Sequence, residues 1–152
     1  MTPSPSRSYL IAAGAVLVVG ALVHLAAIAG GPAWFAALGA PKGLVTLAGT
    51  DSLRPAISCV VIAAALLVCA AYAFSGAGLI RRLPLLRPVL ALIALGLIAR
   101  GLAFLPLAAW RPDLLSGLCG KCAEPGLFLV ATSALCLFVG GGYAVGALRA
   151  RT

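Results

Sequence analysis

Four long runs of apolar residues divide the chain, and each is bounded by glycine, proline or charged residues. The runs extend over about 9–29, 55–74, 86–107 and 125–148. A helix needs about 20 apolar residues to cross the hydrocarbon core of a bilayer, so each run is long enough for one crossing. We therefore expect an all-α membrane protein, in which residues 1–152 form one domain, an up-down bundle of four transmembrane helices.

The segments between the runs predict where helices end and how they connect. The "GGP" at 30–32 is expected to end the first helix, and Pro106 the third. The segment "APKGLVTLAG" (40–49) is too short and too mildly apolar to span, which favours one or two short interfacial helices in the first outer loop. The loop "SGAGLIRRLPLLRP" (75–88) is short and basic, so the second and third helices are expected to form an antiparallel hairpin.

Small residues are frequent in the runs, and they favour close helix packing. In the fourth run Gly142 and Gly146 form a small-xxx-small pair, a pattern that lets two helices approach closely in lipid. We expect this pair to pack inside one subunit rather than to form a dimer face.

Composition supports a location in a membrane. Hydrophobic residues make up 63% of the 152 residues, charged residues only 9%, and the mean hydropathy is +1.17. A soluble domain carries about 25% charged residues. The net charge of +8 would suit nucleic acid, but the basic residues stand at the ends of the apolar runs, where lipid headgroups meet them. Membrane lipid is therefore the expected partner, and nucleic acid is not.

The distribution of charge predicts the orientation. One side of the membrane would hold six basic residues: Arg7, Arg81, Arg82, Arg87, Arg149 and Arg151. The other side would hold the other charged residues of the loops: Lys42, Arg54, Arg111, Lys121, Asp51, Asp113 and Glu124. The positive-inside rule then gives a bacterial inner-membrane protein with both termini in the cytoplasm. A signal peptide cleaved after the A-x-A at 27–29 is the alternative, but the first run is longer than the roughly 7–15 apolar residues of a signal peptide.

Two ionisable residues interrupt the apolar runs, and they fall at the same expected depth. Arg100 lies about 14 residues, or about 21 Å, from the start of its helix near Leu86, and His24 lies about 14 residues from Leu10. Charged side chains inside a membrane usually face the bundle interior or a wet cavity. We expect His24 and Arg100 to line an outward-facing polar pocket. Snorkelling of Arg100 to the outer surface, and a hydrogen-bonded structural role for His24, are the alternatives.

No acidic residue lies inside an apolar run, so an acid partner for Arg100 would have to come from the outer rim. Asp51 precedes the second run and Glu124 precedes the fourth, and either side chain could instead cap a turn or a helix. An inward arginine without an acid at its own depth indicates an external anion, carboxylate or quinone oxygen. The expected ligand-binding residues are His24, Arg100, Asp51 and Glu124.

The loop "GLCGKCAEPG" carries a C-x-x-C pair, Cys119 and Cys122. This spacing is typical of thiol redox centres, and Lys121 between the two cysteines would favour a thiolate. In an oxidising compartment a structural disulfide is the alternative. Zinc would need four ligands, so no metal site is expected. The other three cysteines, Cys59, Cys69 and Cys136, are expected to be buried small apolar residues.

Four helices with a C-x-x-C pair on the periplasmic side are similar to the DsbB and vitamin K epoxide reductase families of quinone-linked disulfide generators. That resemblance implies quinone as cofactor and Cys119 and Cys122 as catalytic residues, although those families use a second cysteine pair and the other cysteines here lie inside the runs. The stretch "YAFSGAGLIRRLPLLRPVLALIALGLIARGLAFLP" (72–106) resembles an uncharacterised family of small bacterial four-helix membrane proteins, which implies no activity. We expect a non-enzymatic protein without a cofactor that binds a lipid, a small amphipath or a partner protein, with a quinone-linked thiol-disulfide oxidoreductase as the alternative.

Overall fold

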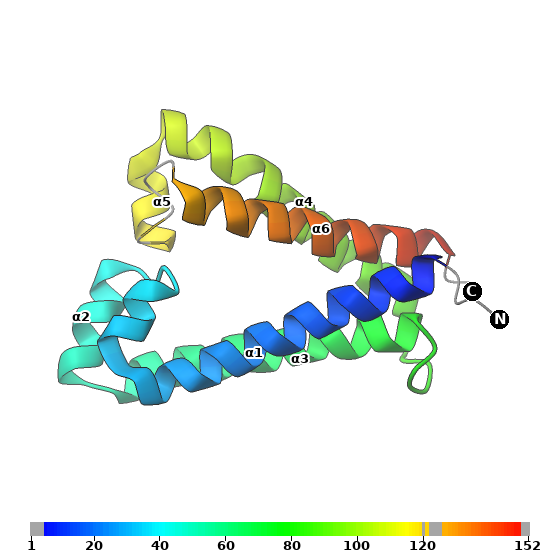
Figure 1. The fold of residues 1–152 in the computed structure, drawn as a ribbon, viewed down its shortest axis with the longest axis horizontal. Coiled ribbons are helices and arrows are strands. Elements are labelled where there is room, and N and C mark those ends of the chain that lie inside the picture. The colour runs from blue at the N-terminus through cyan, green and yellow to red at the C-terminus, as the bar shows by residue number, and fades with distance from the viewer. Residues whose placement is uncertain (1–4, 120, 122–125, 150–152) are drawn as a thin grey trace.

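The computed structural model describes residues 5–119, 121 and 126–149, and this part of the chain is built of helices (Figure 1). The helices are α1 (Pro5–Ala37), α2 (Lys42–Thr50), α3 (Leu53–Gly76), α4 (Leu86–Trp110), α5 (Pro112–Leu118) and α6 (Leu127–Arg149). By length and composition, α1, α3, α4 and α6 are able to cross a membrane. The expected all-α fold with four membrane-spanning helices is confirmed, and α2 is the short helix expected in the first outer loop.

One expected helix end was confirmed and one was wrong. Gly31 takes the non-helical values φ 67° and ψ −160°, so α1 consists of two helical segments joined at a kink in the "GGP" stretch, and the second segment continues to Ala37. A residue with a side chain rarely adopts this positive φ, and Pro32 follows where a new helical segment needs no N–H donor. Pro106 lies inside α4, which ends only at Trp110. Helix α5, which the sequence did not indicate, begins at Pro112, a residue suited to a first helical position.

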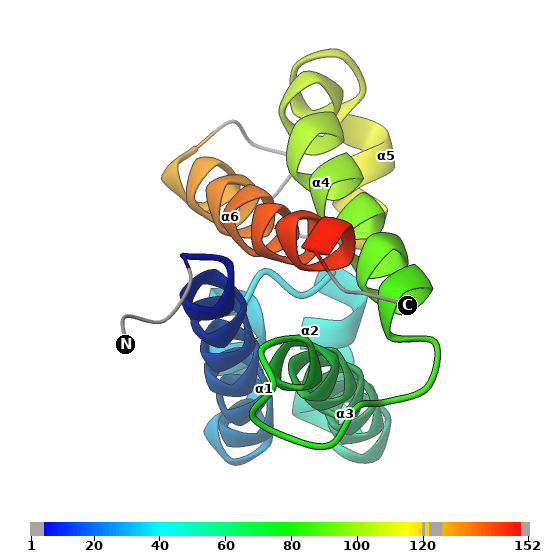
Figure 2. The ribbon, with the colours of Figure 1, turned by 90° about the vertical axis from the view of Figure 1, so that its right-hand side faces the viewer.

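The four long helices form two antiparallel pairs rather than one evenly packed bundle (Figures 1 and 2). Helix α1 packs along α3, and these two helices are the first pair; α4 packs along α6, and these are the second pair. The loop 77–85 does connect α3 to α4, as the sequence predicted. The two helices of that connection, however, pack mainly on other partners.

The two pairs join at the end of the molecule that holds both termini, which we call the termini end (Figure 1). The hydroxyl of Tyr143 on α6 donates a 2.6 Å hydrogen bond to the carbonyl of Cys69 on α3. A Cβ placed on Gly142 would lie 3.0 Å from Tyr9 Cδ1, and one on Gly146 would lie 2.9 Å from Leu10. The two glycines therefore let α6 approach α1, and the expected close packing within one chain is confirmed. The largest buried apolar cluster lies at this junction.

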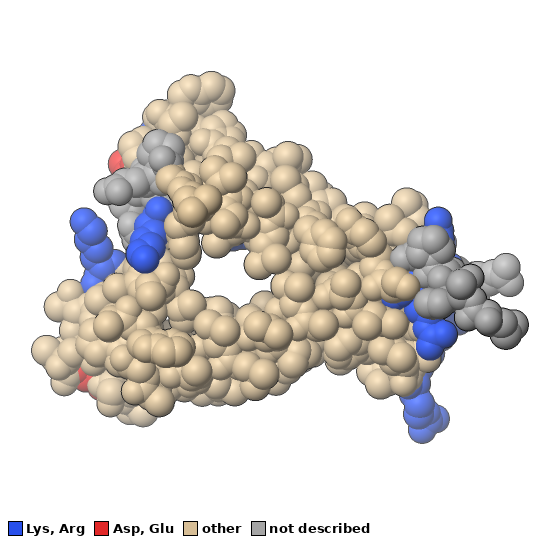
Figure 3. Space-filling model, in the orientation of Figure 1, with Lys and Arg blue, Asp and Glu red and all other residues tan. Residues whose placement is uncertain are grey.

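The pairs meet again at the opposite end, the far end, which carries α2 and α5. There the turn at Gly39 packs against Phe128 and Cys119, and the ammonium of Lys121 donates to the carbonyl of Ala37 at 3.4 Å. Between the two junctions the pairs are separated, and Figure 3 shows an opening that passes through the molecule. We call this opening the window. Close packing between the two pairs therefore occurs only near the ends, whereas within each pair the helices pack along their length.

Candidate functional site

Arg100 contacts a sulfur atom and an aromatic ring instead of an acid. Its Nη1 donates to the Sγ of Cys136 on α6 at 3.3 Å, and its guanidinium carbon lies 4.5 Å from the centroid of the Phe104 ring. The side chain is half-buried. A thiol sulfur is a weak hydrogen-bond acceptor, and a guanidinium group has five N–H donors. These two contacts therefore leave most of the donor capacity of Arg100 for another partner.

Helical spacing places Arg100 in line with residues at the junction of the two pairs. Residues seven apart on a helix lie on nearly the same face, and Leu86, Ile93 and Arg100 have this spacing. Leu86 and Ile93 belong to the apolar cluster that joins the pairs. Arg100 continues their row toward the far end, beyond the point at which the pairs separate.

His24 occupies the corresponding position on the first pair. It follows Leu10 and Leu17 at seven-residue intervals, and both leucines are buried in the same apolar cluster. Its Nδ1 lies 2.8 Å from the carbonyl oxygen of Gly20. Because a carbonyl only accepts, Nδ1 carries the proton, and in the neutral ring Nε2 is then an acceptor. His24 therefore makes the structural hydrogen bond that the sequence analysis gave as the alternative. Its Nε2 remains available to accept a hydrogen bond from a ligand.

His24 and Arg100 lie on different helix pairs, and among the described residues neither contacts the other. Their polar contacts, within the part of the chain that the structure describes, stay inside their own helix pairs. Asp51 is exposed, and its Oδ1 accepts a 3.0 Å hydrogen bond from the N–H of Leu53. It therefore caps the turn before α3, which the sequence analysis gave as the alternative. In the structure the Asp51 side chain contacts this turn and does not contact Arg100. Glu124 lies outside the described residues.

The other described acid is also engaged away from the window. Asp113 forms an exposed ion pair with Arg111, with 3.0 Å between the closest nitrogen and oxygen atoms. The hydrogen bond from Arg111 holds the pKa of the Asp113 carboxyl below its usual range. Neither acid among the described residues therefore neutralises Arg100.

Sequence reasoning missed four residues near the window. Phe104 lies one helical turn after Arg100, a spacing that could have indicated the ring contact. Cys136 gave no signal, because a single cysteine in an apolar run is usually a small buried residue. Lys42 and Lys121 flank a hollow of about 410 Å³ at the far end. Both lysines stand in outer loops, and only the fold brings them together.

Cys122 of the C-x-x-C pair lies outside the described residues. Cys119 is half-buried, and its sulfur lies 3.3 Å from the position that a Cβ on Gly39 would take. Among the described residues, Cys59, Cys69 and Cys136 are free thiols; Cys59 is buried as expected, whereas Cys69 and Cys136 are only half-buried. The part of the chain that the structure describes has no group of three or more metal-ligating side chains.

We expect Cys119 and Cys122 to form a static disulfide. In isolated membranes, a variant that keeps only these two cysteines should not react with a maleimide until a reductant is added. A structural bond should also be insensitive to the redox state of the quinone pool, whereas a catalytic bond exchanges with partner thiols. A mixed disulfide trapped in a Cys122→Ala variant would contradict this expectation and support a redox enzyme.

Comparisons with protein-family models, with curated proteins and with solved structures give no match to this chain. The chemistry of its own side chains is therefore what indicates a function. The most specific features are the window between the helix pairs and the two ionisable side chains, His24 and Arg100, which belong to membrane-spanning helices of opposite pairs.

Proposed function

We propose that this is a non-enzymatic integral membrane protein that binds an anionic amphipath, a lipid or a smaller molecule with a carboxylate or phosphate group, in the window. The observation that carries the proposal is the state of Arg100. It is a half-buried cation in a membrane-spanning helix, and its partners are a sulfur atom and a ring. A charge in this environment is costly, and an external anion would offset the cost.

The shape of the window suits a molecule with an acyl or isoprenoid chain. The opening lies between the membrane-spanning helix pairs, and it is closed by a junction at each end (Figures 1 and 3). A ligand would therefore enter sideways from the lipid, with its chain against the apolar walls. Its anionic group would contact Arg100, and the Nε2 of His24 would accept a hydrogen bond from a hydroxyl or a protonated acid.

The charge distribution supports an approach from the far end of the membrane. Lys42 and Lys121 flank the hollow beside the far junction, and they would attract an anionic headgroup before it reaches Arg100. With both termini in the cytoplasm, as the basic residues of the termini end favour, this approach is from the outer leaflet. The proposed ligand is therefore an amphipath of that leaflet.

Replacing Arg100 with glutamine tests the proposal. A charge-assisted hydrogen bond contributes about 1.5–3 kcal/mol, and the affinity for a fluorescent fatty acid should therefore fall about 10- to 100-fold. Binding would be measured by titration in mild detergent, with a fatty alcohol of the same chain length as the uncharged ligand. The wild-type protein should prefer the acid over the alcohol, and the variant should lose this preference.

Arg54→Gln is the matched control, because Arg54 is exposed at the far-end start of α3. It should bind the acid as the wild-type protein does. Thermal unfolding of both variants would confirm that they are folded. Equal affinity of Arg100→Gln and wild type for the acid, or equal affinity of the wild type for acid and alcohol, would refute the proposed role of the window.

A further inference from the structure

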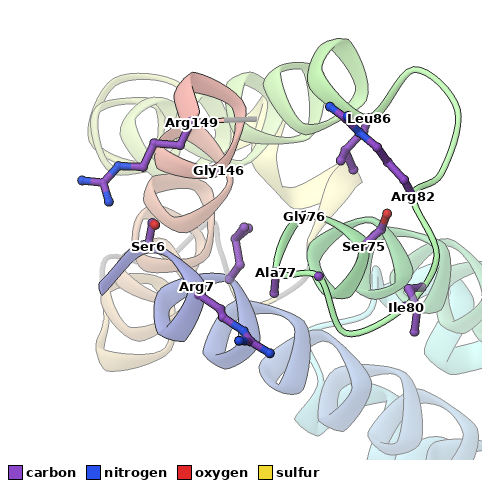
Figure 4. A pocket seen from close by; sticks show the side chains of 12 residues that line it. Ser6, Arg7, Ser75, Gly76, Ala77, Ile80, Arg82, Leu86, Gly146 and Arg149 are labelled. Carbon is purple, nitrogen blue, oxygen red and sulfur yellow. The ribbon is translucent and has the colours of Figure 1, made fainter. Parts of the chain in front are cut away.

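A second cavity lies at the termini end, on the other side of the junction from the window. Its volume is about 460 Å³, and it opens between the first turn of α1, the end of α3 with the following loop, and the adjoining ends of α4 and α6 (Figure 4). All four long helices therefore contribute to its wall. The apolar cluster that joins the helix pairs separates it from Arg100 and His24.

Three arginines line this cavity, and each comes from a different segment. Arg7 belongs to α1, Arg82 to the loop 77–85, and Arg149 to the last turn of α6. All three side chains are exposed at the rim, and Figure 4 shows their guanidinium groups well apart from one another.

No acidic side chain is among the residues that line the cavity. The two acids of the described residues, Asp51 and Asp113, lie at the far end, in or beside the connections that hold α2 and α5. Figure 3 shows basic side chains at both ends of the molecule and acidic side chains only at the far end of the face in view. A hollow lined by one sign of charge concentrates counter-ions, so this cavity favours an anion.

The wall of the cavity is fixed by hydrogen bonds in the loop that carries Arg82. The buried hydroxyl of Ser75 donates to the carbonyl of Arg81 at 3.1 Å and accepts from the N–H of Leu83 at 2.9 Å. The loop is therefore tied to the end of α3 on both sides of Arg82. On the inner side, Leu10 and Leu86 are buried and give the cavity an apolar floor. The site combines a basic rim with an apolar floor.

We infer that this cavity binds a phosphate group, carried either by a membrane lipid or by a small soluble ester. Guanidinium groups form paired hydrogen bonds to phosphate oxygens, and three arginines on a common rim can turn inward to bind one such group. The apolar floor would contact the glycerol or the first part of the chain attached to the phosphate. This site is independent of the proposed ligand of the window.

The test uses full-length protein stripped of lipid in mild detergent. Native mass spectrometry would measure retention of phosphatidic acid against phosphatidylcholine, and thermal unfolding would measure the response to glycerol 3-phosphate and to inorganic phosphate. A variant with Arg7→Gln, Arg82→Gln and Arg149→Gln should retain phosphatidic acid at least about tenfold more weakly than the wild type. Arg100→Gln should retain it as the wild type does.

Arg87→Gln is the matched control, because Arg87 is exposed in the first turn of α4 beside the cavity but does not line it. It should retain phosphatidic acid like the wild type. Stabilisation by phosphatidic acid alone would identify a lipid headgroup as the ligand, and stabilisation by glycerol 3-phosphate as well would identify the phosphate ester itself. Unchanged retention in the triple variant, or an equal loss in Arg87→Gln, would overturn the inference, because surface charge and not the cavity would then determine binding.

Discussion

Replacing Tyr143 with alanine is expected to destabilise the protein by about 3 kcal/mol, the cost of removing a fully buried aromatic side chain. Tyr143 has no exposed surface and lies at the junction where α6 meets the first pair. The substitution removes the ring and also the hydrogen bond to the carbonyl of Cys69. Because packing rather than water exclusion holds helices together in lipid, the lost contacts determine the effect. Unfolding in a denaturing detergent would measure it.

Tyr143→Phe separates the hydroxyl from the ring. Hydrogen bonds between membrane helices contribute about 0.6 kcal/mol on average, so this variant should be only slightly less stable than the wild type. Tyr72→Phe is a suitable control, because the Tyr72 hydroxyl makes an exposed 3.3 Å bond to the carbonyl of Pro84 in the loop that follows α3, and this bond does not join the two pairs. It should have almost no effect. If the Phe and Ala variants of Tyr143 were equally unstable, the hydroxyl and not the packed ring would hold the pairs together.

The number of membrane-spanning helices could be predicted because four apolar runs of sufficient length leave few alternatives. The arrangement of the helices could not be predicted in the same way. Each long helix is apolar on nearly all sides, so the sequence pattern does not identify the face that packs. Pairing instead depends on close contacts at particular small residues, such as Gly101 against Leu137 and Gly140 against Ile98.

Helix ends were harder to predict than helix positions. Glycine and proline end most helices in water, because the exposed backbone can hydrogen-bond to solvent. In a membrane the backbone must remain hydrogen-bonded within the protein, so a helix tends to continue through such residues with a kink. Pro106 illustrates this behaviour inside α4, whereas Gly31 interrupts α1 with non-helical backbone angles.

The candidate site stays a prediction. Counting residues from the start of each helix gives His24 and Arg100 the same depth, and seven-residue spacing puts each in line with residues of the apolar cluster that joins the pairs. The contacts of Arg100 could not be foreseen, because α4 reaches Cys136 only through its packing on α6. The position of Asp51 in the sequence is compatible with a contact to Arg100 or with a turn cap. The geometry of the turn before α3 determines its role as a cap.

Substitution of Gly140 with alanine should destabilise the second pair by about 1–3 kcal/mol, the usual cost of overpacking. A Cβ at this position would lie 2.8 Å from Ile98 Cγ1 and 3.2 Å from the backbone nitrogen of Ile98. The side-chain atom can move, but the backbone of α4 can yield only if the two helices separate. Detergent-induced unfolding would measure the loss of stability.

Gly141→Ala is the control, because a Cβ on Gly141 would meet no atom within 4 Å. Its stability should be unchanged or raised by up to about 1 kcal/mol, since alanine favours a helix more than glycine does. Gly140 lies one turn from Cys136, so separation of α4 from α6 would also lengthen the contact between Cys136 and Arg100. The Gly140 variant should therefore bind the acidic amphipath more weakly, and the Gly141 variant should bind it normally. Equal stability of the two variants would show that α4 and α6 do not pack at Gly140.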